Sequence, residues 1–119
     1  MKKHDALAAL AALAQDNRLD VFRLLVQAGR DGMAAGSVAA ALKLAPNTLS
    51  FHFDRLRDAG LVAVRRNGRS MIYSARYEAM NALIGYLTEN CCQGRVDECM
   101  PLQNEKPGTG RVLRKDFVR

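Results

Sequence analysis

Three cysteines that lie close together are the strongest candidates in this sequence for metal binding or redox chemistry. They are Cys91, Cys92 and Cys99, and no other position holds a cysteine. Cα atoms of adjacent residues lie about 3.8 Å apart, below the roughly 4.4 Å at which disulfides begin, so Cys91 and Cys92 form a poor disulfide with each other. Two adjacent thiolates can still bind one ion, and a loop of six intervening residues can return Cys99 as a third ligand.

A site of three sulfur atoms suits a trivalent, pyramidal ion that prefers thiolates, such as arsenite, As(III), or antimonite, Sb(III). Zinc or cadmium would take a fourth ligand, which Asp97 or Glu98 would have to supply because no histidine lies nearby. Two alternatives remain open. Cys91 alone can be a small hydrophobic residue on a helix face, and a disulfide from Cys99 to Cys91 or Cys92 would make the cluster a redox sensor.

The same residues disfavour a thiol enzyme such as an arsenate reductase. Enzymes of that kind hold an anion in a loop between the reactive cysteine and an arginine. Here Arg95 follows Cys92 by only three positions, and no predicted strand precedes the cysteine. We therefore expect no enzymatic activity and no resident cofactor.

The second candidate site is the stretch that begins at Pro46. Leu49, Phe53 and Leu56 recur at i, i+4 and i+7, which predicts a helix that ends at Gly60 and faces the core with this stripe. The opposite side presents polar groups and one phenylalanine, which suit contact with base edges in a major groove. The residues assigned to DNA contact here are Asn47, Thr48, Ser50, Phe51, His52 and Arg55. His52 lies about 60° from the centre of the stripe, so packing or hydrogen bonding suits it equally.

A predicted β-hairpin follows this helix directly. Residues 61–66 and 69–74 form two short runs joined by Asn67-Gly68, a strong signal for a two-residue turn. Arg65, Arg66 and Arg69 surround the turn and are expected to contact phosphates. A helix with a polar outer side followed by a basic hairpin predicts a winged helix-turn-helix, a mainly α fold with a β-hairpin wing.

The distribution of charge supports a polyanionic partner. Of the net charge of +6, residues 43–76 contribute +5, whereas residues 77–100 contribute −3. Positive charge concentrated on the helix and hairpin fits double-stranded DNA with a defined footprint better than a chain that is basic everywhere.

Further helices must position this helix and hairpin. We expect a first helix over residues 5–14, a third over 38–42, and a last one from Tyr77 to about Gln93. The second helix is expected to begin after an N-cap at Asp16 and to carry an apolar stripe of Leu19, Phe22, Leu25 and Val26. The first and last helices carry apolar faces that need a partner, which predicts a homodimer formed through them. Residues 1–100 are expected to form one domain for DNA binding and dimerisation, and 101–119 a flexible basic tail.

The amino-terminal apolar run is about ten residues long, too short to span a bilayer, and no cleavage site follows it. We therefore expect a cytoplasmic protein without a membrane partner.

Residues 11–77 resemble the ArsR/SmtB metal-sensing repressors. ALAQDNRLDVFRLL is similar to the opening helix pair of that family, LSFHFDRLRDAGLV to its recognition helix, and RRNGRSMIYS to its wing. The resemblance implies a homodimeric repressor that binds a palindromic operator and is released by its inducer. By this resemblance, Ser50 and His52 correspond to the signature Ser and His of the recognition helix, and Arg18 corresponds to the arginine of the second helix. Phe51 departs from the polar residue that is common at its position.

The family resemblance also bears on the inducer site. Many arsenic sensors of this family carry a Cys-Val-Cys pair that would fall near residues 34–39, and this sequence has no cysteine there. The inducer site is therefore expected at Cys91, Cys92 and Cys99, with arsenite as the first choice of inducer.

Overall fold

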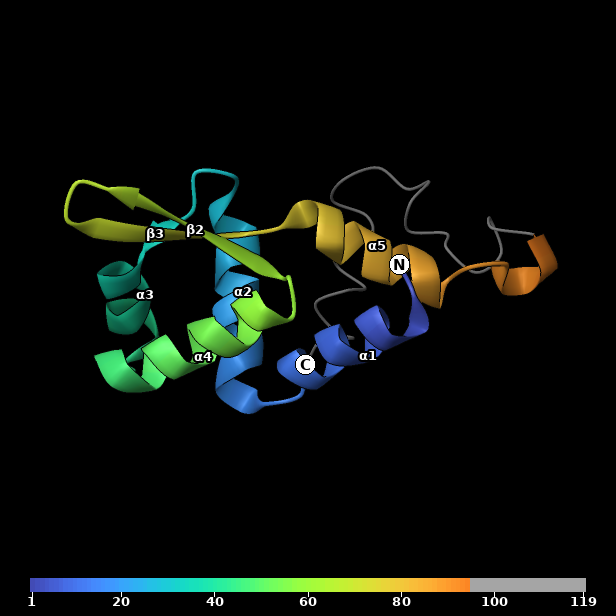
Figure 1. Cartoon of the computed structure of the whole chain (residues 1–119), viewed down its shortest axis with the longest axis horizontal. Helices are drawn as coiled ribbons and strands as arrows, with labels where there is room; N and C mark the ends of the chain where they lie inside the picture. Colours follow the sequence, from blue (N-terminus) through green and yellow to red (C-terminus); the bar gives the residue numbers. More distant parts are fainter. Residues whose placement is uncertain (95–119) are drawn as a thin grey trace, which may run out of the picture. The chain divides into compact units, whose positions relative to one another are not determined.

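The computed structural model describes residues 1–94, which divide into a compact unit, Met1–Leu87, and a second unit that begins at Thr88 (Figure 1). The elements of the first unit are α1 (Lys3–Leu13), α2 (Asp16–Ala28), β1 (Met33–Ala34), α3 (Ala35–Leu42), α4 (Pro46–Asp58), β2 (Val62–Asn67), β3 (Ser70–Ala75) and α5 (Tyr77–Leu87). This order confirms the predicted winged helix-turn-helix. Within residues 1–94, no helix is both long and apolar enough to cross a membrane.

The core forms where α4 crosses α2 (Figure 1). The predicted stripe of α4 is confirmed, since Leu49, Phe53 and Leu56 are all buried. In α2 the prediction was partly wrong. Phe22 and Leu25 are buried as expected, but Val21 joins them in the core and Leu19 is exposed.

The start of α2 also differs from the prediction. Asp16 was expected to be the N-cap, but it is the first helical residue, and Gln15 caps the helix. The Gln15 side-chain oxygen accepts a hydrogen bond from the backbone N–H of Arg18 at 2.9 Å. A side-chain oxygen at this position satisfies one of the N–H groups that the first helical turn leaves unpaired.

The packing of α1 leaves two of its three leucines outside the core of the unit, whereas Leu13 packs against it. Its buried side consists of Ala6, Ala9 and Ala12, whereas Leu7 and Leu10 are exposed. Small buried side chains allow α1 to approach α2 and α4 closely. Leu7 and Leu10 therefore remain available on the outer face of α1.

The hairpin carries a third strand that the sequence did not predict. The sheet order is β1-β3-β2, with Met33 opposite Tyr73 and Ala34 opposite Ile72. Gly32 makes this pairing possible, because its φ is +75° and a Cβ there would collide with the carbonyl oxygen of Tyr73. A strand of two residues is too short to show a periodic pattern.

The register of the hairpin differs by one residue from the prediction. Asn67 pairs with Ser70, so the turn residues are Gly68 and Arg69 rather than Asn67-Gly68. Gly68 has φ +65°, whereas Arg69 does not have a positive φ. A glycine at the first central position is typical of a type II′ turn, whereas a type I′ turn would require positive φ at both.

Helix α5 ends at Leu87, six residues before the predicted end near Gln93. Asn90, Cys92 and Gln93 have left-handed φ angles, and Cys91–Gly94 forms a short 3-10 helix, η1. Threonine, asparagine and cysteine are weak helix formers, and asparagine tolerates left-handed geometry better than most residues. Cys91 therefore does not lie on the α5 stripe, and its interpretation as a small hydrophobic residue of that helix was wrong. Cys99, the expected domain boundary at residue 100 and the tail 101–119 lie outside the described residues.

Candidate functional site

The outer side of α4 carries most of the residues assigned to DNA contact. Its N-cap is Ala45, which supplies no capping side chain, and Pro46 occupies the first turn, where its missing N–H costs nothing. Five of the six assigned side chains on this helix are exposed: Asn47, Thr48, Ser50, Phe51 and Arg55. Since Leu49, Phe53 and Leu56 hold the other side in the core, the helix presents a fixed polar face near its N-terminus.

An aromatic and a cationic side chain contact each other on this face. The guanidinium carbon of Arg55 lies 4.9 Å from the ring centroid of Phe51. The two residues are one helical turn apart, which brings their side chains together on one face.

The wing presents its arginines on two different faces. Alternation along β2 and β3 puts Arg66 and Met71 on the same face as the core residues Val62 and Tyr73. Arg65 lies on the opposite face, where its guanidinium donates to the carbonyl oxygen of Asp31 at 3.2 Å. The structure thus directs Arg66 to the side of the wing that faces α4, and ties Arg65 to the loop before β1.

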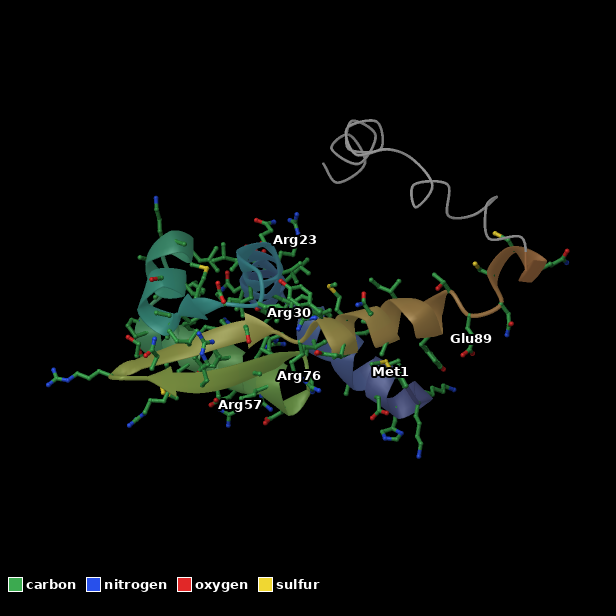
Figure 2. All side chains as sticks on the ribbon, turned by 90° about the horizontal axis from the view of Figure 1, so that it is seen from above. Met1, Arg23, Arg30, Arg57, Arg76 and Glu89 are labelled. Carbon is green, nitrogen blue, oxygen red and sulfur yellow. The ribbon has the colours of Figure 1, made fainter. Side chains whose placement is uncertain are left out.

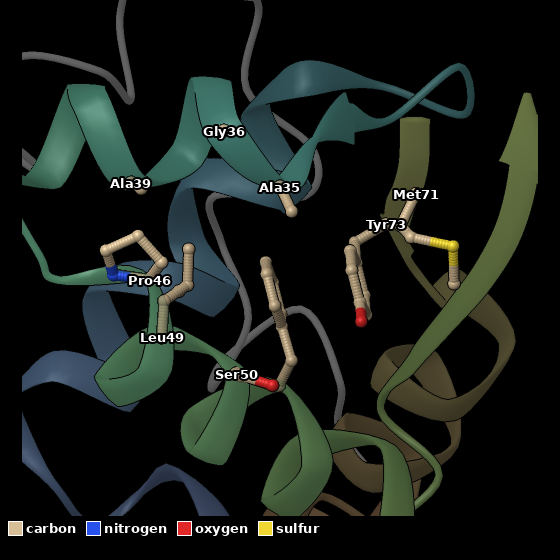
Figure 3. A pocket seen from close by; sticks show the side chains of 9 residues that line it. Ala35, Gly36, Ala39, Pro46, Leu49, Ser50, Met71 and Tyr73 are labelled. Carbon is tan, nitrogen blue, oxygen red and sulfur yellow. The ribbon is translucent and has the colours of Figure 1, made fainter. Parts of the chain in front are cut away.

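An aromatic stack joins the wing to α4. The rings of Phe53 and Tyr73 are parallel within 3°, with centroids 3.6 Å apart. They line a cavity of about 230 Å³ between α3, α4 and β3, beside Ser50 and Met71 (Figure 3). Short side chains of α3, among them Ala35 and Ala39, leave this space open. The stack is therefore a main packed connection between α4 and the wing.

His52 is a correction to the predicted DNA contacts. Its side chain is only 5% exposed, and both ring nitrogens are buried without a hydrogen-bond partner. Burial and, secondarily, the positive charge of Arg18 lower the pKa of His52 below its ordinary value of 6.5. The Nε of Arg18 donates to the carbonyl oxygen of Ala12 at 2.7 Å, which holds that charge between α1 and α2. His52 is consequently a core residue in this structure and does not reach a groove.

The buried imidazole predicts a loss of stability in mild acid. Because its folded pKa is lowered, the unfolded chain binds more protons as the pH falls below 6.5. Above that pH, protonation of His52 should therefore take nothing from the free energy of unfolding. Below that pH, the free energy of unfolding should decrease as the pH falls, by at most about 1.4 kcal/mol per pH unit for one proton. Urea unfolding between about pH 5.5 and 7.5 measures this slope. His52→Met should flatten it, whereas the same change at the exposed His4 should not. An unchanged slope in His52→Met would rule out this role.

Sequence reasoning missed a set of contacts that tie α5 to α2. The hydroxyl of Tyr77 donates to the carbonyl oxygen of Val26 at 2.7 Å. Arg30 is labelled in Figure 2. Its guanidinium lies 5.4 Å from the Tyr77 ring centroid and 3.7 Å from a carboxylate oxygen of Glu78. The sequence marked Tyr77 only as the expected start of the last helix, because periodicity says nothing about its hydroxyl. These contacts connect the start of α5 to the helix that supports α4.

The predicted thiol site is described only in part. Cys91 and Cys92 are both half-buried in η1, and Cys92 is disulfide-bonded. No group of three His, Cys, Asp or Glu side chains with metal-binding geometry occurs among residues 1–94. The third predicted ligand, Cys99, lies outside that range, as do Asp97 and Glu98.

Comparisons with known proteins agree with this geometry. A family model described as a helix-turn-helix domain matches residues 13–65. The HTH-type transcriptional regulator YgaV of Escherichia coli K12 is 33% identical over 73% of this chain and 86% of its own length. An ArsR-like transcriptional regulator from Rhodococcus sp. RHA1 shares the fold, with 22% identity, a TM-score of 0.66, and coverage of 87% of this chain and 95% of its own.

A second solved structure is similar over most of the described residues. It is the homodimeric winged helix-turn-helix DNA-binding domain of a possible ArsR-family transcriptional regulator from Mycobacterium bovis. That domain is 26% identical, with a TM-score of 0.59, and the match covers 73% of this chain and 81% of the domain. All three proteins are described as transcriptional regulators and none as an enzyme.

Proposed function

The chain belongs to the helix-turn-helix transcriptional regulators. From this, and from its similarity to a possible ArsR-family regulator of known structure, we propose that it is an ArsR/SmtB-type regulator that represses transcription in the cytoplasm as a homodimer on operator DNA. We further propose that arsenite or antimonite releases it by binding Cys91, Cys92 and Cys99. The observation that supports operator binding most directly is the exposed polar face of α4 beside a wing whose Arg66 side faces that helix. A helix in the major groove with a hairpin against phosphates is how this architecture contacts DNA.

The homodimer is supported by an apolar surface that α1 and α5 build together. The two helices contact each other, and each carries exposed large apolar side chains. We call this surface the α1–α5 seam; its residues are Leu7, Leu10, Ile84 and Leu87. Apolar side chains gathered in this way indicate an interface. A second copy of the chain is the partner that we propose for this surface, since a two-fold axis would place the α1–α5 seam of one copy against the same seam of the other.

Arsenite is proposed as the inducer because the cluster offers three sulfur ligands and few oxygen or nitrogen ligands. Thiolates select soft ions, and a pyramidal trivalent centre is satisfied by three of them. The second unit begins directly after Leu87, a seam residue, so an ion held by the cysteines can act on the dimer geometry. A hundredfold loss of operator affinity requires about 2.7 kcal/mol of coupling between the two sites.

The disulfide at Cys92 supports a second candidate, a repressor of the same fold that senses thiol oxidation. One experiment separates the two. Operator binding of the fully reduced protein is measured while arsenite, antimonite, zinc, cadmium and, in a separate series, peroxide are titrated. Release by arsenite at the lowest concentration supports the proposal. Release by peroxide alone would assign the cluster to redox sensing, and release by zinc or cadmium alone would assign it to a four-ligand metal site.

The wing should contribute affinity without sequence preference. Arg66→Ala and Arg69→Ala are expected to weaken binding to all duplexes alike, and each lost phosphate contact should reduce the slope of log K against log salt by about 1. Arg65→Ala is the comparison. Arg65 was also predicted to contact phosphates, but its guanidinium is bonded to Asp31 on the opposite face of the hairpin, so its removal should change the slope less. Fluorescence anisotropy at several salt concentrations measures the slope. Equal slopes in the Arg66 variant and the unmodified protein would contradict this assignment of the wing.

A further inference from the structure

An exposed phenylalanine stands on the polar face of α4. Phe51 is 51% exposed, although the other phenylalanines of the described unit, Phe22 and Phe53, are buried. The guanidinium of Arg55 covers its ring at 4.9 Å. Helical side chains lean toward the N-terminus, so Arg55 brings its charge back to the level of Phe51. That level belongs to the part of a recognition helix that contacts base edges.

The edge of the Arg55 guanidinium remains available for a ligand. Among residues 1–94, the ion pairs are His4–Asp5 and Arg30–Glu78, so Arg55 is paired with neither Asp54 nor Asp58 on its own helix. No side-chain hydrogen bond involves Arg55 within that range. The contact with the Phe51 ring restrains the guanidinium, whose N–H donors all lie in its own plane. A restrained planar donor edge suits an acceptor pair in the same plane.

We infer that Phe51 and Arg55 act together to read a thymine next to a guanine in each operator half-site; this inference rests on the proposed operator binding. The in-plane N–H groups of Arg55 match O6 and N7 of guanine, and the Phe51 ring gives an apolar contact for the C5-methyl group of thymine. Successive bases lie about 3.4 Å apart along a strand. The 4.9 Å between guanidinium and ring therefore suits neighbouring base pairs rather than distant ones.

Base analogues test both contacts without changing the protein. Operators are first selected from a randomised duplex library with the reduced full-length protein. In the selected duplex, deoxyuridine in place of the thymine removes only the methyl group, and 7-deazaguanine in place of the guanine removes only the N7 acceptor. We expect about a fourfold loss of affinity for the first, the value of one apolar carbon, and at least about fivefold for the second.

Variants test whether the two residues act as a pair. Phe51→Ala should lose sensitivity to deoxyuridine and, because Arg55 is then no longer held, should also reduce the penalty of 7-deazaguanine. Arg55→Met keeps a side chain of similar length but has no N–H donor, and should lose sensitivity to 7-deazaguanine alone. Arg57→Ala is the control, since this exposed arginine of the same helix has no contact with Phe51 among the described residues.

The outcomes separate this inference from the proposed function. If the library yields no preferred sequence, operator binding itself fails. If a preferred sequence is selected but neither analogue changes the affinity of the unmodified protein, the inference is overturned while operator binding stands. If Phe51→Ala weakens binding to every duplex equally, Phe51 only supports the helix. Thermal unfolding of each variant confirms that the fold is intact, as expected for changes at exposed positions.

Discussion

A Cys92→Ser protein is expected to bind operator DNA as tightly as the unmodified protein and to stay bound at arsenite concentrations that release the unmodified protein. Cys92 lies in the second unit, outside the helices and the hairpin that carry the candidate DNA contacts. Removing one of three thiolates leaves arsenite with two, so its affinity and its effect on the dimer should both fall. If release requires a hundredfold loss of affinity, the variant loses about 2.7 kcal/mol of coupling.

This experiment requires reduced protein, because a disulfide at Cys92 would remove a ligand before arsenite is added. Cys91→Ser and Cys99→Ser should behave like Cys92→Ser. Asp97→Asn is the matched control, since a carboxylate is needed only by an ion that takes a fourth ligand. Operator binding during arsenite titration gives the result. If the Cys92→Ser protein were released at the same arsenite concentration as the unmodified protein, the proposed three-sulfur site would be wrong.

Charges introduced into the α1–α5 seam should have the largest effect on DNA binding. Leu7 and Leu87 are 57% and 58% exposed in one copy of the chain, so aspartate at both positions should leave the fold of that copy intact. In a homodimer the same positions would be buried, and four buried carboxylates would prevent association. A monomer binds only one half-site and loses the gain from linked binding, about 10²–10⁴-fold in affinity.

Sedimentation velocity and operator binding of the double variant Leu7→Asp, Leu87→Asp measure both effects. Leu19→Asp is a suitable control, because Leu19 is a similarly exposed leucine on α2, outside the seam. The control should remain dimeric and bind normally. A double variant that remained dimeric would show that the interface lies elsewhere on the chain.

Local signals in the sequence determined much of the fold. The spacing of Leu49, Phe53 and Leu56 predicted helix α4 and the side of it that faces the core, because an apolar stripe with a helical period over two turns marks one face. The turn signal at Asn67-Gly68 predicted the hairpin, and the cluster of arginines around it predicted the basic wing. The cysteine cluster is visible in sequence for the same reason, since its members are neighbours along the chain.

Only the tertiary structure decided the features that depend on residues far apart in the sequence. Strand β1 exists because Met33 and Ala34 pair with β3, about forty residues later. Arg65 and Arg66 look equivalent in sequence, but a one-residue step along a strand reverses the face, and the observed pairing directs only Arg66 to the side of α4.

The position of His52 shows the same limit on the recognition helix itself. A side chain about 60° from the centre of the stripe is buried or exposed according to which element packs beside it. The apolar period of α4 therefore could not predict that His52 is buried near Arg18 of α2. Helix α5 likewise ended at Leu87 rather than near Gln93, because apolar spacing extends past a helix end when local backbone preferences stop the helix. Periodicity identifies a face, whereas the neighbouring elements decide what covers it.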